Sequence, residues 1–278
     1  MKHALITISA IVTVALSLAV SGAGANGSPY SPGLAYGWAG VGASNGVHYV
    51  TLGPSEWTVV AAIRERNGHV VRTRTLRGFY GIPLVTYDGT TGGLSGDGRS
   101  LVMASYGPLP GGAGTTRFVA LRTKTLEPYR LVELRGSWSY DAISPDGKTL
   151  YLVEHLAAGQ DPRYRVRIFD LARGRLLAGA IVDRLEKESV MGGQPATRAS
   201  SPDGRWAYTL YARAEGEPFV HALDTAGREA FCIDLPLHLG EAKQMGLRLA
   251  LNGGELVVRN GRTTVAVVNT KTWEVRRG

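Results

Sequence analysis

Cysteine is nearly absent from this chain. Cys232 is the only one among 278 residues, so no disulfide can form within the molecule, and stability has to come from a packed core. The residue stands in the apolar run Phe231-Cys232-Ile233. That setting is typical of a small buried side chain rather than of a reactive thiol.

Signatures of metal and nucleotide chemistry are missing too. No two of the histidines beyond His3 stand at a metal-ligand spacing, and neither a His-Glu-x-x-His motif nor a phosphate-cradling glycine loop occurs. The sequence therefore predicts no metal and no cofactor, and we assign no catalytic residue. Binding is expected rather than catalysis.

Long apolar runs are lacking except at the start. Ala4–Val20 is a run of 17 uncharged residues that follows Lys2 and precedes Ser21-Gly22-Ala23-Gly24-Ala25. A basic start, an apolar core and an Ala-x-Ala ending predict a secretory signal peptide, cleaved after Ala25. Because about 17 residues also reach the lower limit for crossing a bilayer, an uncleaved anchor is the alternative.

The rest of the chain is expected to consist of a linker and one domain. Residues 26–34 form a short linker, and residues 35–278 form one domain with no further run long enough to span a membrane. No cysteine near the cleavage site could carry a lipid. We expect a monomeric protein that is secreted, or periplasmic and associated with the cell envelope.

Acidic residues are in deficit. The chain has 31 Lys and Arg against 23 Asp and Glu, a net charge of +8, and removal of residues 1–25 takes away one lysine and leaves +7. An exported basic protein is attracted to acidic surfaces such as anionic glycans. Nucleic acid is not expected as a partner, because export separates the protein from it. Solubility alone is the other explanation of the charge.

Helical periodicity is scarce, whereas glycine is abundant at 37 residues, which favours short strands and tight turns. One turn motif recurs along the chain, with its glycines spaced by 52, 49, 57 and 50 residues. A near-constant period of this size indicates repeated supersecondary units. The five turns are Ala43-Ser44-Asn45-Gly46, Ser95-Gly96-Asp97-Gly98, Ser144-Pro145-Asp146-Gly147, Ser201-Pro202-Asp203-Gly204 and Leu251-Asn252-Gly253-Gly254.

Each repeat predicts four antiparallel strands. Proline fixes φ at the second position of the turn, and glycine takes the left-handed position after the aspartate. Asp146 and Asp203 are therefore expected to cap turns rather than to act chemically. A single sheet cannot bury both faces, so we predict an all-β propeller of about five four-stranded blades. An elongated stack of sheets is the alternative.

The turn and strand pattern resembles that of known propellers. Ser-Pro-Asp-Gly-Lys before an alternating strand is similar to the repeat of TolB-type and WD-repeat-like propellers, and Val265–Val275 resembles part of a YVTN-type repeat. The resemblance runs from about Pro32 to Gly278 and implies the fold. TolB proteins carry an additional α/β domain for which this chain has no room, so the resemblance does not imply a Tol-system role.

In such propellers the loops that lead into the innermost strands surround one mouth of the central channel. Carried onto this chain, the resemblance implies a mouth rich in aromatic and polar side chains, which suits a sugar or a peptide. The alternative is that the aromatic residues wedge adjacent blades together. The implied mouth residues are Trp38, Tyr80, Tyr87, Asp88, Trp138, Tyr140, Asp141, Gln194, Arg198, Gln244 and Arg248.

Three functional hypotheses follow. The first is an exported propeller that binds a protein, a peptide or an anionic glycan of the cell envelope. The second is a carbohydrate-active enzyme, a glycoside hydrolase or lyase, in which Asp88 and Asp141 would supply acid and base. The third is a scaffold without a small ligand. Three long excursions could also carry function, since loops on rigid scaffolds often do: Gly107–Thr116, His155–Arg163 and Asp183–Arg198.

Overall fold

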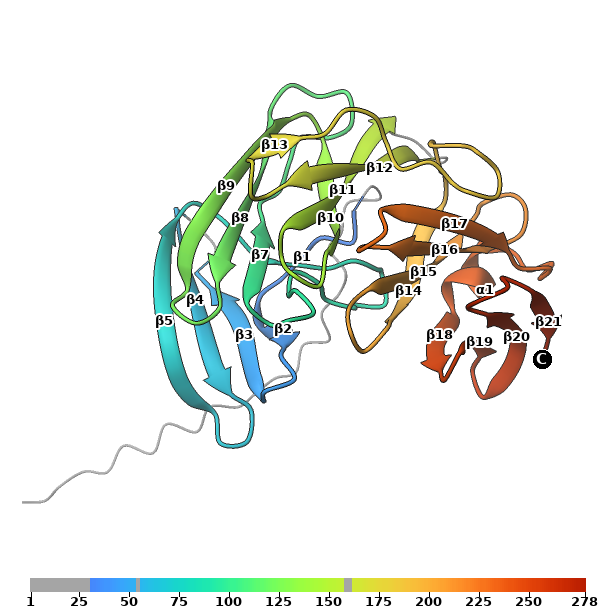
Figure 1. Ribbon diagram of the computed structural model, residues 1–278, viewed down its shortest axis with the longest axis horizontal. Helices are drawn as coiled ribbons and strands as arrows, with labels where there is room; N and C mark the ends of the chain where they lie inside the picture. The colour runs from blue at the N-terminus through green and yellow to red at the C-terminus, as the bar shows by residue number, and fades with distance from the viewer. Residues whose placement is uncertain (1–30, 54–55, 158–161) are drawn as a thin grey trace, which may run out of the picture.

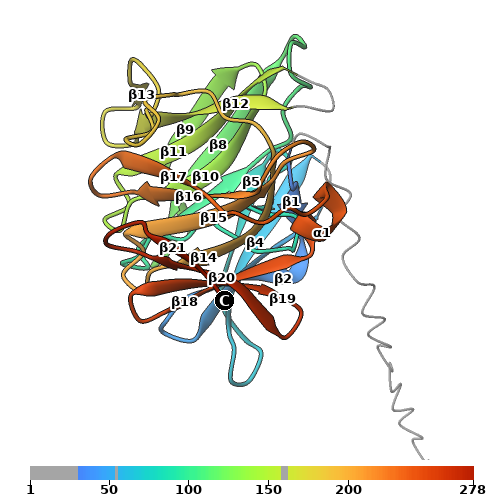
Figure 2. The same cartoon turned by 90° about the vertical axis from the view of Figure 1, so that its right-hand side faces the viewer.

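The computed structural model describes residues 31–53, 56–157 and 162–278. The predicted signal peptide and most of the linker lie outside these residues. The regular secondary structure of the described chain is almost entirely β-strand (Figures 1 and 2). Its one helix, α1 (Glu241–Met245), is a single short turn of chain between the last two large sheets.

Five antiparallel sheets, each made of consecutive strands, follow one another along the chain. The first contains β2 (Gly37–Gly42), β3 (Val47–Leu52), β4 (Trp57–Arg64) and β5 (His69–Arg77), and the second β7 (Ser100–Ala104), β8 (Thr115–Arg122) and β9 (Glu127–Arg135). The third contains β10 (Trp138–Ile143), β11 (Thr149–Ala157), β12 (Arg163–Asp170) and β13 (Arg175–Leu176). The fourth contains β14 (Gln194–Ser200), β15 (Trp206–Ala212), β16 (Phe219–Asp224) and β17 (Glu229–Asp234). The fifth contains β18 (Leu247–Asn252), β19 (Glu255–Asn260), β20 (Thr263–Asn269) and β21 (Val275–Arg277).

The recurring aspartates cap turns, as predicted. Asp146 Oδ1 accepts hydrogen bonds from the Ser144 hydroxyl at 2.7 Å and from the Lys148 backbone N–H at 3.1 Å. Asp203 repeats the pattern one sheet later, and Gly147 has a φ of +69°. These bonds satisfy backbone and hydroxyl groups within each turn and fix the hairpin between the first two strands of the sheet.

Buried hydrophobic clusters join each sheet to the next. They connect the first sheet to the second, the second to the third, the third to the fourth and the fourth to the fifth. None of these clusters joins the fifth sheet to the first, and Figure 1 shows the five sheets along an arc with those two sheets at its ends. The predicted fold class, an all-β propeller of four-stranded blades, is confirmed.

The second sheet departs from the repeat. An excursion replaces its expected innermost strand. The excursion begins at Gly81, which forms an isolated bridge with Ala104 of β7, and ends at Leu94, which forms an isolated bridge with Leu101 of β7. Within it, β6 (Ile82–Pro83) pairs with β1 (Leu34–Ala35). We call residues 84–98 the hub segment, because it runs through the middle of the arc in Figure 1.

The hub segment ties three sheets together through backbone hydrogen bonds. Tyr87 N–H donates to Pro195 O at 2.9 Å and Asp88 N–H donates to Ala196 O at 3.2 Å, both on β14. Asp97 N–H donates to Pro145 O at 2.9 Å in the turn of the third sheet. Chain that belongs to the second sheet therefore occupies part of the space inside the arc (Figure 1).

Gly96 lies where the hub segment packs against the turns of the third and fourth sheets. A Cβ at this position would lie 2.4 Å from Asp203 O and 3.3 Å from Pro145 Cα, and both atoms are backbone. We expect Gly96→Ala to lower the free energy of unfolding by about 1–3 kcal/mol, because the segment must move away from both turns. Chemical denaturation measures this.

Gly254→Ala is the matched control, since it also lies in a hairpin turn and its Cβ would find no atom closer than 3.9 Å. Equal stability of the two variants would show that the hub segment does not pack tightly against the third and fourth sheets.

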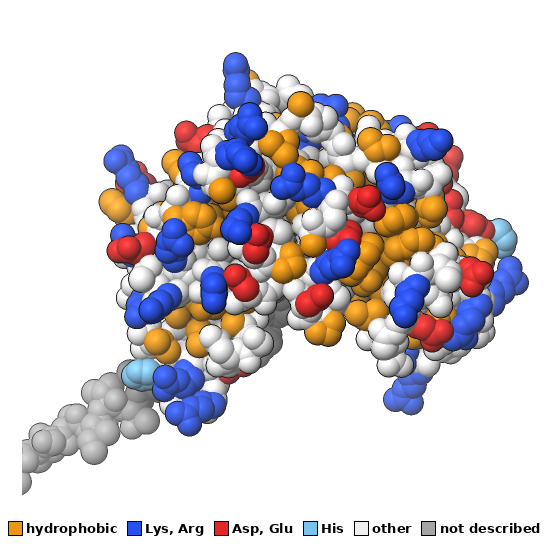
Figure 3. All heavy atoms as spheres, in the orientation of Figure 1, with side chains coloured by type: hydrophobic (Ala, Val, Ile, Leu, Met, Phe, Trp, Pro, Cys, Tyr) orange, Lys and Arg blue, Asp and Glu red, His pale blue; other side chains and the backbone are white. Residues whose placement is uncertain are grey.

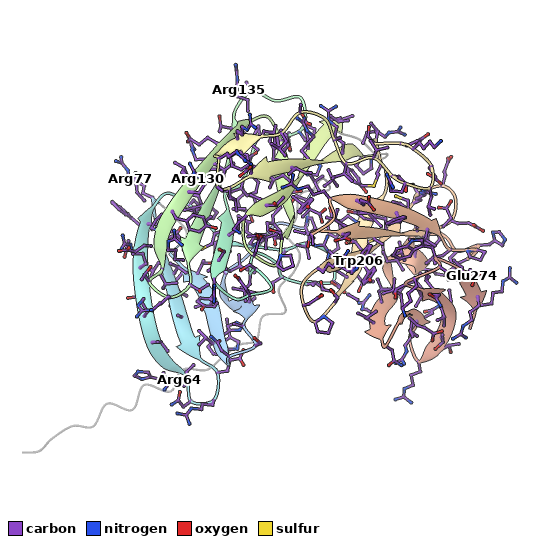
Figure 4. The ribbon with its side chains drawn as sticks, viewed as in Figure 1. Arg64, Arg77, Arg130, Arg135, Trp206 and Glu274 are labelled. Carbon is purple, nitrogen blue, oxygen red and sulfur yellow. The ribbon has the colours of Figure 1, made fainter. Side chains whose placement is uncertain are left out.

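The outer surface carries hydrophobic, basic and acidic side chains (Figure 3). Figure 3 shows hydrophobic side chains gathered over the fourth and fifth sheets, where Trp206, Phe231 and Trp273 form an aromatic cluster with ring centroids 4.9 to 6.2 Å apart. Arg77 and Arg135, labelled in Figure 4, project outward from β5 and β9. The outer strands of the first two sheets thus carry part of the positive charge.

Candidate ligand-binding site

Several of the predicted mouth residues come together. Tyr87, Tyr140, Asp141 and Gln194 line one narrow cavity of about 30 Å³, which we call the mouth cavity. Tyr87 reaches it from the hub segment, Tyr140 and Asp141 from β10, and Gln194 from the start of β14. Tyr164 and Tyr211 add two more rings, stacked with centroids 5.7 Å apart.

A buried ion pair adjoins the mouth cavity, which Asp141 lines. The side chains of Arg198 and Asp141 are 7% and 2% exposed and are in direct contact. Arg198 also donates to Asp141 O at 2.6 Å and to Thr209 Oγ1 at 2.8 Å. The pair lines a second cavity of about 230 Å³ as well. This position suggests that the pair holds the third and fourth sheets together.

The other predicted mouth residues do not line the mouth cavity, whose lining comes mainly from the hub segment and from the third and fourth sheets. Trp38 is 62% exposed and stacks on His48, whereas Tyr80 and Trp138 are buried in the clusters between sheets. Gln244 accepts from Arg213 N–H and donates to Gly216 O and Leu239 O, and exposed Arg248 donates to Leu247 O.

Asp88 lies beside this site on the hub segment. Its side chain accepts hydrogen bonds from the hydroxyls of Thr86 at 2.6 Å and Thr90 at 2.8 Å. Burial opposes ionisation, but the hydrogen bonds from Thr86, Thr197 and Thr90 outweigh it and lower the pKa of Asp88. A glycosidase needs one carboxyl group that keeps its proton. Asp88, held ionised, does not provide it.

A larger cavity adjoins the mouth cavity and was not predicted as a site. It measures about 520 Å³, and it shares Pro162, Gly193 and Gln194 with the mouth cavity. We call it the acidic pocket. Its lining comprises Pro162, Arg163, Asp183, Glu186, Glu188, Val190, Met191, Gly192, Gly193, Gln194, Arg213, Ala214, Glu215, Phe219, Cys232 and Glu241.

A closed loop positions the carboxylates on one side of the acidic pocket. Asp183 N–H donates to Glu188 O at 2.7 Å, Lys187 N–H donates to Asp183 O at 2.9 Å, and Arg184 N–H donates to Ala230 O at 2.9 Å. These bonds anchor the loop on β17. The carboxyl groups of Asp183, Glu186 and Glu188 are therefore presented from a fixed backbone.

The floor of the acidic pocket is apolar. Phe219 and Cys232 are buried on β16 and β17, and the Cys232 thiol lies 3.8 Å from Met191 Sδ. Arg213 crosses the ring of Phe219 at 4.4 Å from its centroid and pairs with Asp234 at 3.1 Å. The pocket thus combines an apolar base with a charged rim, as small-ligand sites do.

Cys232 and His221 are a potential nucleophile and base, since Cys232 Sγ lies 3.5 Å from His221 Nδ1 on the neighbouring strand. Burial and the nearby charge of Asp183 raise the pKa of the Cys232 thiol, and burial lowers the pKa of His221. Both groups are held neutral. A thiolate nucleophile needs the opposite shift, so this pair does not favour catalysis.

Gly42-Ala43-Ser44-Asn45-Gly46 has the spacing of a serine-hydrolase elbow. In the structure it forms the hairpin turn between β2 and β3, where Asn45 Oδ1 accepts from Val47 N–H at 3.2 Å. An elbow requires a strand that turns directly into a helix. The segment is therefore a turn of the repeat.

Metal binding and membrane crossing find no support in residues 31–53, 56–157 and 162–278. No group of three or more His, Cys, Asp or Glu side chains there could hold a metal ion. No helix among those residues has the length and apolar character needed to cross a membrane.

Known proteins resemble the chain only in structure. No protein-family model matches it, and no curated protein matches it. Among solved structures, TolB from Acinetobacter baumannii is 14% identical with a TM-score of 0.36, over 83% of this chain and 56% of that one. The propeller domain of Cps50 (Swd1) from Myceliophteria thermophila is 13% identical with a TM-score of 0.46, over 83% and 62%. Hydrazine synthase from Kuenenia stuttgartiensis is 15% identical with a TM-score of 0.43, over 81% and 74%.

The chain thus spans little more than half of the TolB protein and less than two thirds of the Swd1 domain, and likenesses this distant carry no information about ligand or reaction. The repeated sheets and Asp-Gly turns of the chain itself identify its fold as a β-propeller.

Proposed function

We propose that this protein is an exported binding protein that takes its ligand in the acidic pocket, with the mouth cavity as the inner end of the site. Export rests on the predicted signal at residues 1–25. Binding rests on a single observation, a cavity of about 520 Å³ between the third and fourth sheets. That volume lies within the usual range for ligand sites, about 300–1,000 Å³.

Rigid elements surround the proposed site. Buried side chains from β11, β12, β15, β16 and β17 pack together between the third and fourth sheets, so the walls are fixed before a ligand arrives. A preformed site loses less entropy on binding than a mobile one. The Cys232 thiol along it is held neutral, which does not favour a thiolate nucleophile and supports binding over turnover.

The partners expected from the sequence divide between two surfaces. An anionic glycan does not suit the acidic pocket, because its lining carries five carboxyl groups against two guanidinium groups. The outward arginines of the first two sheets suit such a polymer better. A protein or peptide partner remains compatible with the pocket.

A side chain that fills the pocket tests the proposal. Ala214 is exposed and lines the acidic pocket, so Ala214→Trp should occupy it without disturbing the core. Peptide and glycan arrays would be probed with the wild-type protein and with this variant. We expect at least a tenfold loss of the peptide binding that the wild-type protein shows.

Ala172→Trp is the control, since Ala172 is also exposed and lies in a turn of the third sheet outside the pocket lining. It should bind as the wild-type protein does. Binding that survives Ala214→Trp unchanged would place the ligand elsewhere and contradict the proposal.

A further inference from the structure

The acidic pocket has a charge opposite to that of the whole protein. Five carboxyl groups and two guanidinium groups line it, an excess of three negative charges, whereas the chain carries +8. Burial, together with the nearby charges of Asp234 and Asp183, raises the pKa of Glu186. The carboxyl groups are thus close enough to repel one another, and a cation between them would relieve that repulsion.

Asp183 provides the independent observation. The residue is 5% exposed, and its Oδ1 accepts hydrogen bonds from Leu185 N–H at 3.0 Å and Cys232 N–H at 3.1 Å. Its Oδ2 is buried and receives no nitrogen or oxygen donor from the residues that the structure describes. The neighbouring thiol of Cys232 is only a weak donor. A buried carboxylate oxygen without a strong donor is costly, and a ligand with N–H groups would satisfy it.

The polar groups nearby are committed to other partners. The Arg213 guanidinium pairs with Asp234 and lies over Phe219, and the Gln194 amide donates to Glu241 Oε1 at 3.1 Å. Neither is hydrogen-bonded to Asp183 Oδ2. A ligand in the pocket would supply the donor that these two groups do not.

The geometry selects the kind of cation. No three carboxyl, imidazole or thiol groups of the described chain converge closely enough to ligate one metal ion. The carboxyl groups surround a cavity of about 520 Å³ instead, and its floor is apolar at Phe219, Cys232 and Met191. A charged group on a flexible hydrocarbon stem matches both features, since the stem can cover the floor while the charge meets the carboxylates.

We propose that the acidic pocket binds an alkylammonium group, as presented by a lysine side chain of a peptide, with the ammonium at Asp183 Oδ2 and the methylene groups against Phe219 and Met191. The inference rests on the proposed function and names the ligand chemistry of that site. An ammonium group has three donors and no acceptor, so it can bond Asp183 and a rim carboxylate at once.

Calorimetric titration with matched peptides tests the chemistry. N-acetylated and C-amidated Gly-Gly-Lys-Gly-Gly should bind, and the same blocked peptide with norleucine, which keeps the hydrocarbon stem and has no ammonium group, should bind at least tenfold more weakly. Raising the salt concentration from about 0.02 M to 0.5 M should weaken the lysine peptide severalfold, because its attraction to the rim is screened. A free diamine, 1,5-diaminopentane, is a further arm: binding as tight as that of the peptide would identify free amines as the source of the same group.

Variants locate the ammonium group. Asp183→Asn keeps the side-chain shape and Oδ1, and we expect at least a tenfold loss of lysine-peptide affinity. Because this buried change could affect folding, the exposed pair Glu188→Gln and Glu215→Gln is the second test, with a loss of about threefold to tenfold. Glu133→Gln, on β9 outside the pocket, should leave the affinity unchanged.

Two failures can be told apart. If Ala214→Trp abolishes array binding but the lysine and norleucine peptides bind equally, or neither binds, the pocket is a site and the alkylammonium assignment is wrong. If lysine-peptide binding is unaffected by Ala214→Trp, both the assignment and the proposed site are overturned. Loss of lysine-peptide binding in Asp183→Asn and in Ala214→Trp, with Glu133→Gln unchanged, supports the proposal.

Discussion

Replacing Arg198 by methionine should lower the free energy of unfolding by about 3–5 kcal/mol, since it leaves the buried Asp141 carboxylate without its partner. Asp141 is 2% exposed and its Oδ2 already lacks a hydrogen-bond partner within the described chain. The variant also removes the donors to Asp141 O and Thr209 Oγ1. Thermal and urea unfolding of Arg198→Met measure the loss.

A double variant distinguishes the cost of an unpaired charge from the value of the pair. Asp141→Leu combined with Arg198→Met removes both charges from the interior, and we expect it to be more stable than Arg198→Met alone. Arg117→Met is the matched control, because Arg117 pairs with Glu133 at 2.6 Å with both side chains about half exposed, 52% and 51%. It should cost about 0–1 kcal/mol. Equal losses in Arg117→Met and Arg198→Met would show that burial of the central pair has no energetic consequence.

The second large effect is expected on acidification. Burial lowers the pKa of His155 to about 4, and its ring lies 2.9 Å from the Ser139 hydroxyl and packs edge-on against Tyr164. In the unfolded chain a histidine titrates near pH 6.5. The unfolded state therefore binds the proton first, and stability is lost as pH falls from about 6.5 to about 4.

The shift corresponds to at most about 3 kcal/mol, at 1.36 kcal/mol per pKa unit. Burial also lowers the pKa of His221, so its contribution has the same sign. We expect the unfolding free energy of the wild-type protein to fall through this window and that of His155→Gln to fall less. NMR titration of the His155 ring provides the control, since the ring should remain neutral until about pH 4. A midpoint near pH 6.5 would contradict the explanation.

The repeat architecture was accessible from sequence because its determinants are local. Asp146 and Gly147 make a turn through bonds to residues two positions away, and the strands on either side of it, β10 and β11, pair directly from Ile143 and Leu150 onward. Local chemistry of this kind is readable without knowledge of distant neighbours. The same reasoning correctly assigned Cys232 to the core.

The site was accessible only in part. Tyr140, Asp141 and Gln194 lead into innermost strands, and a repeat places such residues near one another. Asp183 was not predicted as a site residue because it lies in a polar loop. Its burial depends on contacts with β17, which is distant in the sequence. The excursions at residues 155–163 and 183–198 were predicted as long loops. Pro162 and Arg163 of the first and several residues of the second line the acidic pocket, but only the packing of two sheets shows that they enclose a space.

The hub segment constrains when this protein can finish folding. Tyr87 and Pro195, which it connects, are separated by 108 positions in the chain. Contacts between such distant residues slow folding, because a long loop must close before they form. The hub segment therefore reaches its final contacts only after β14 has been synthesised.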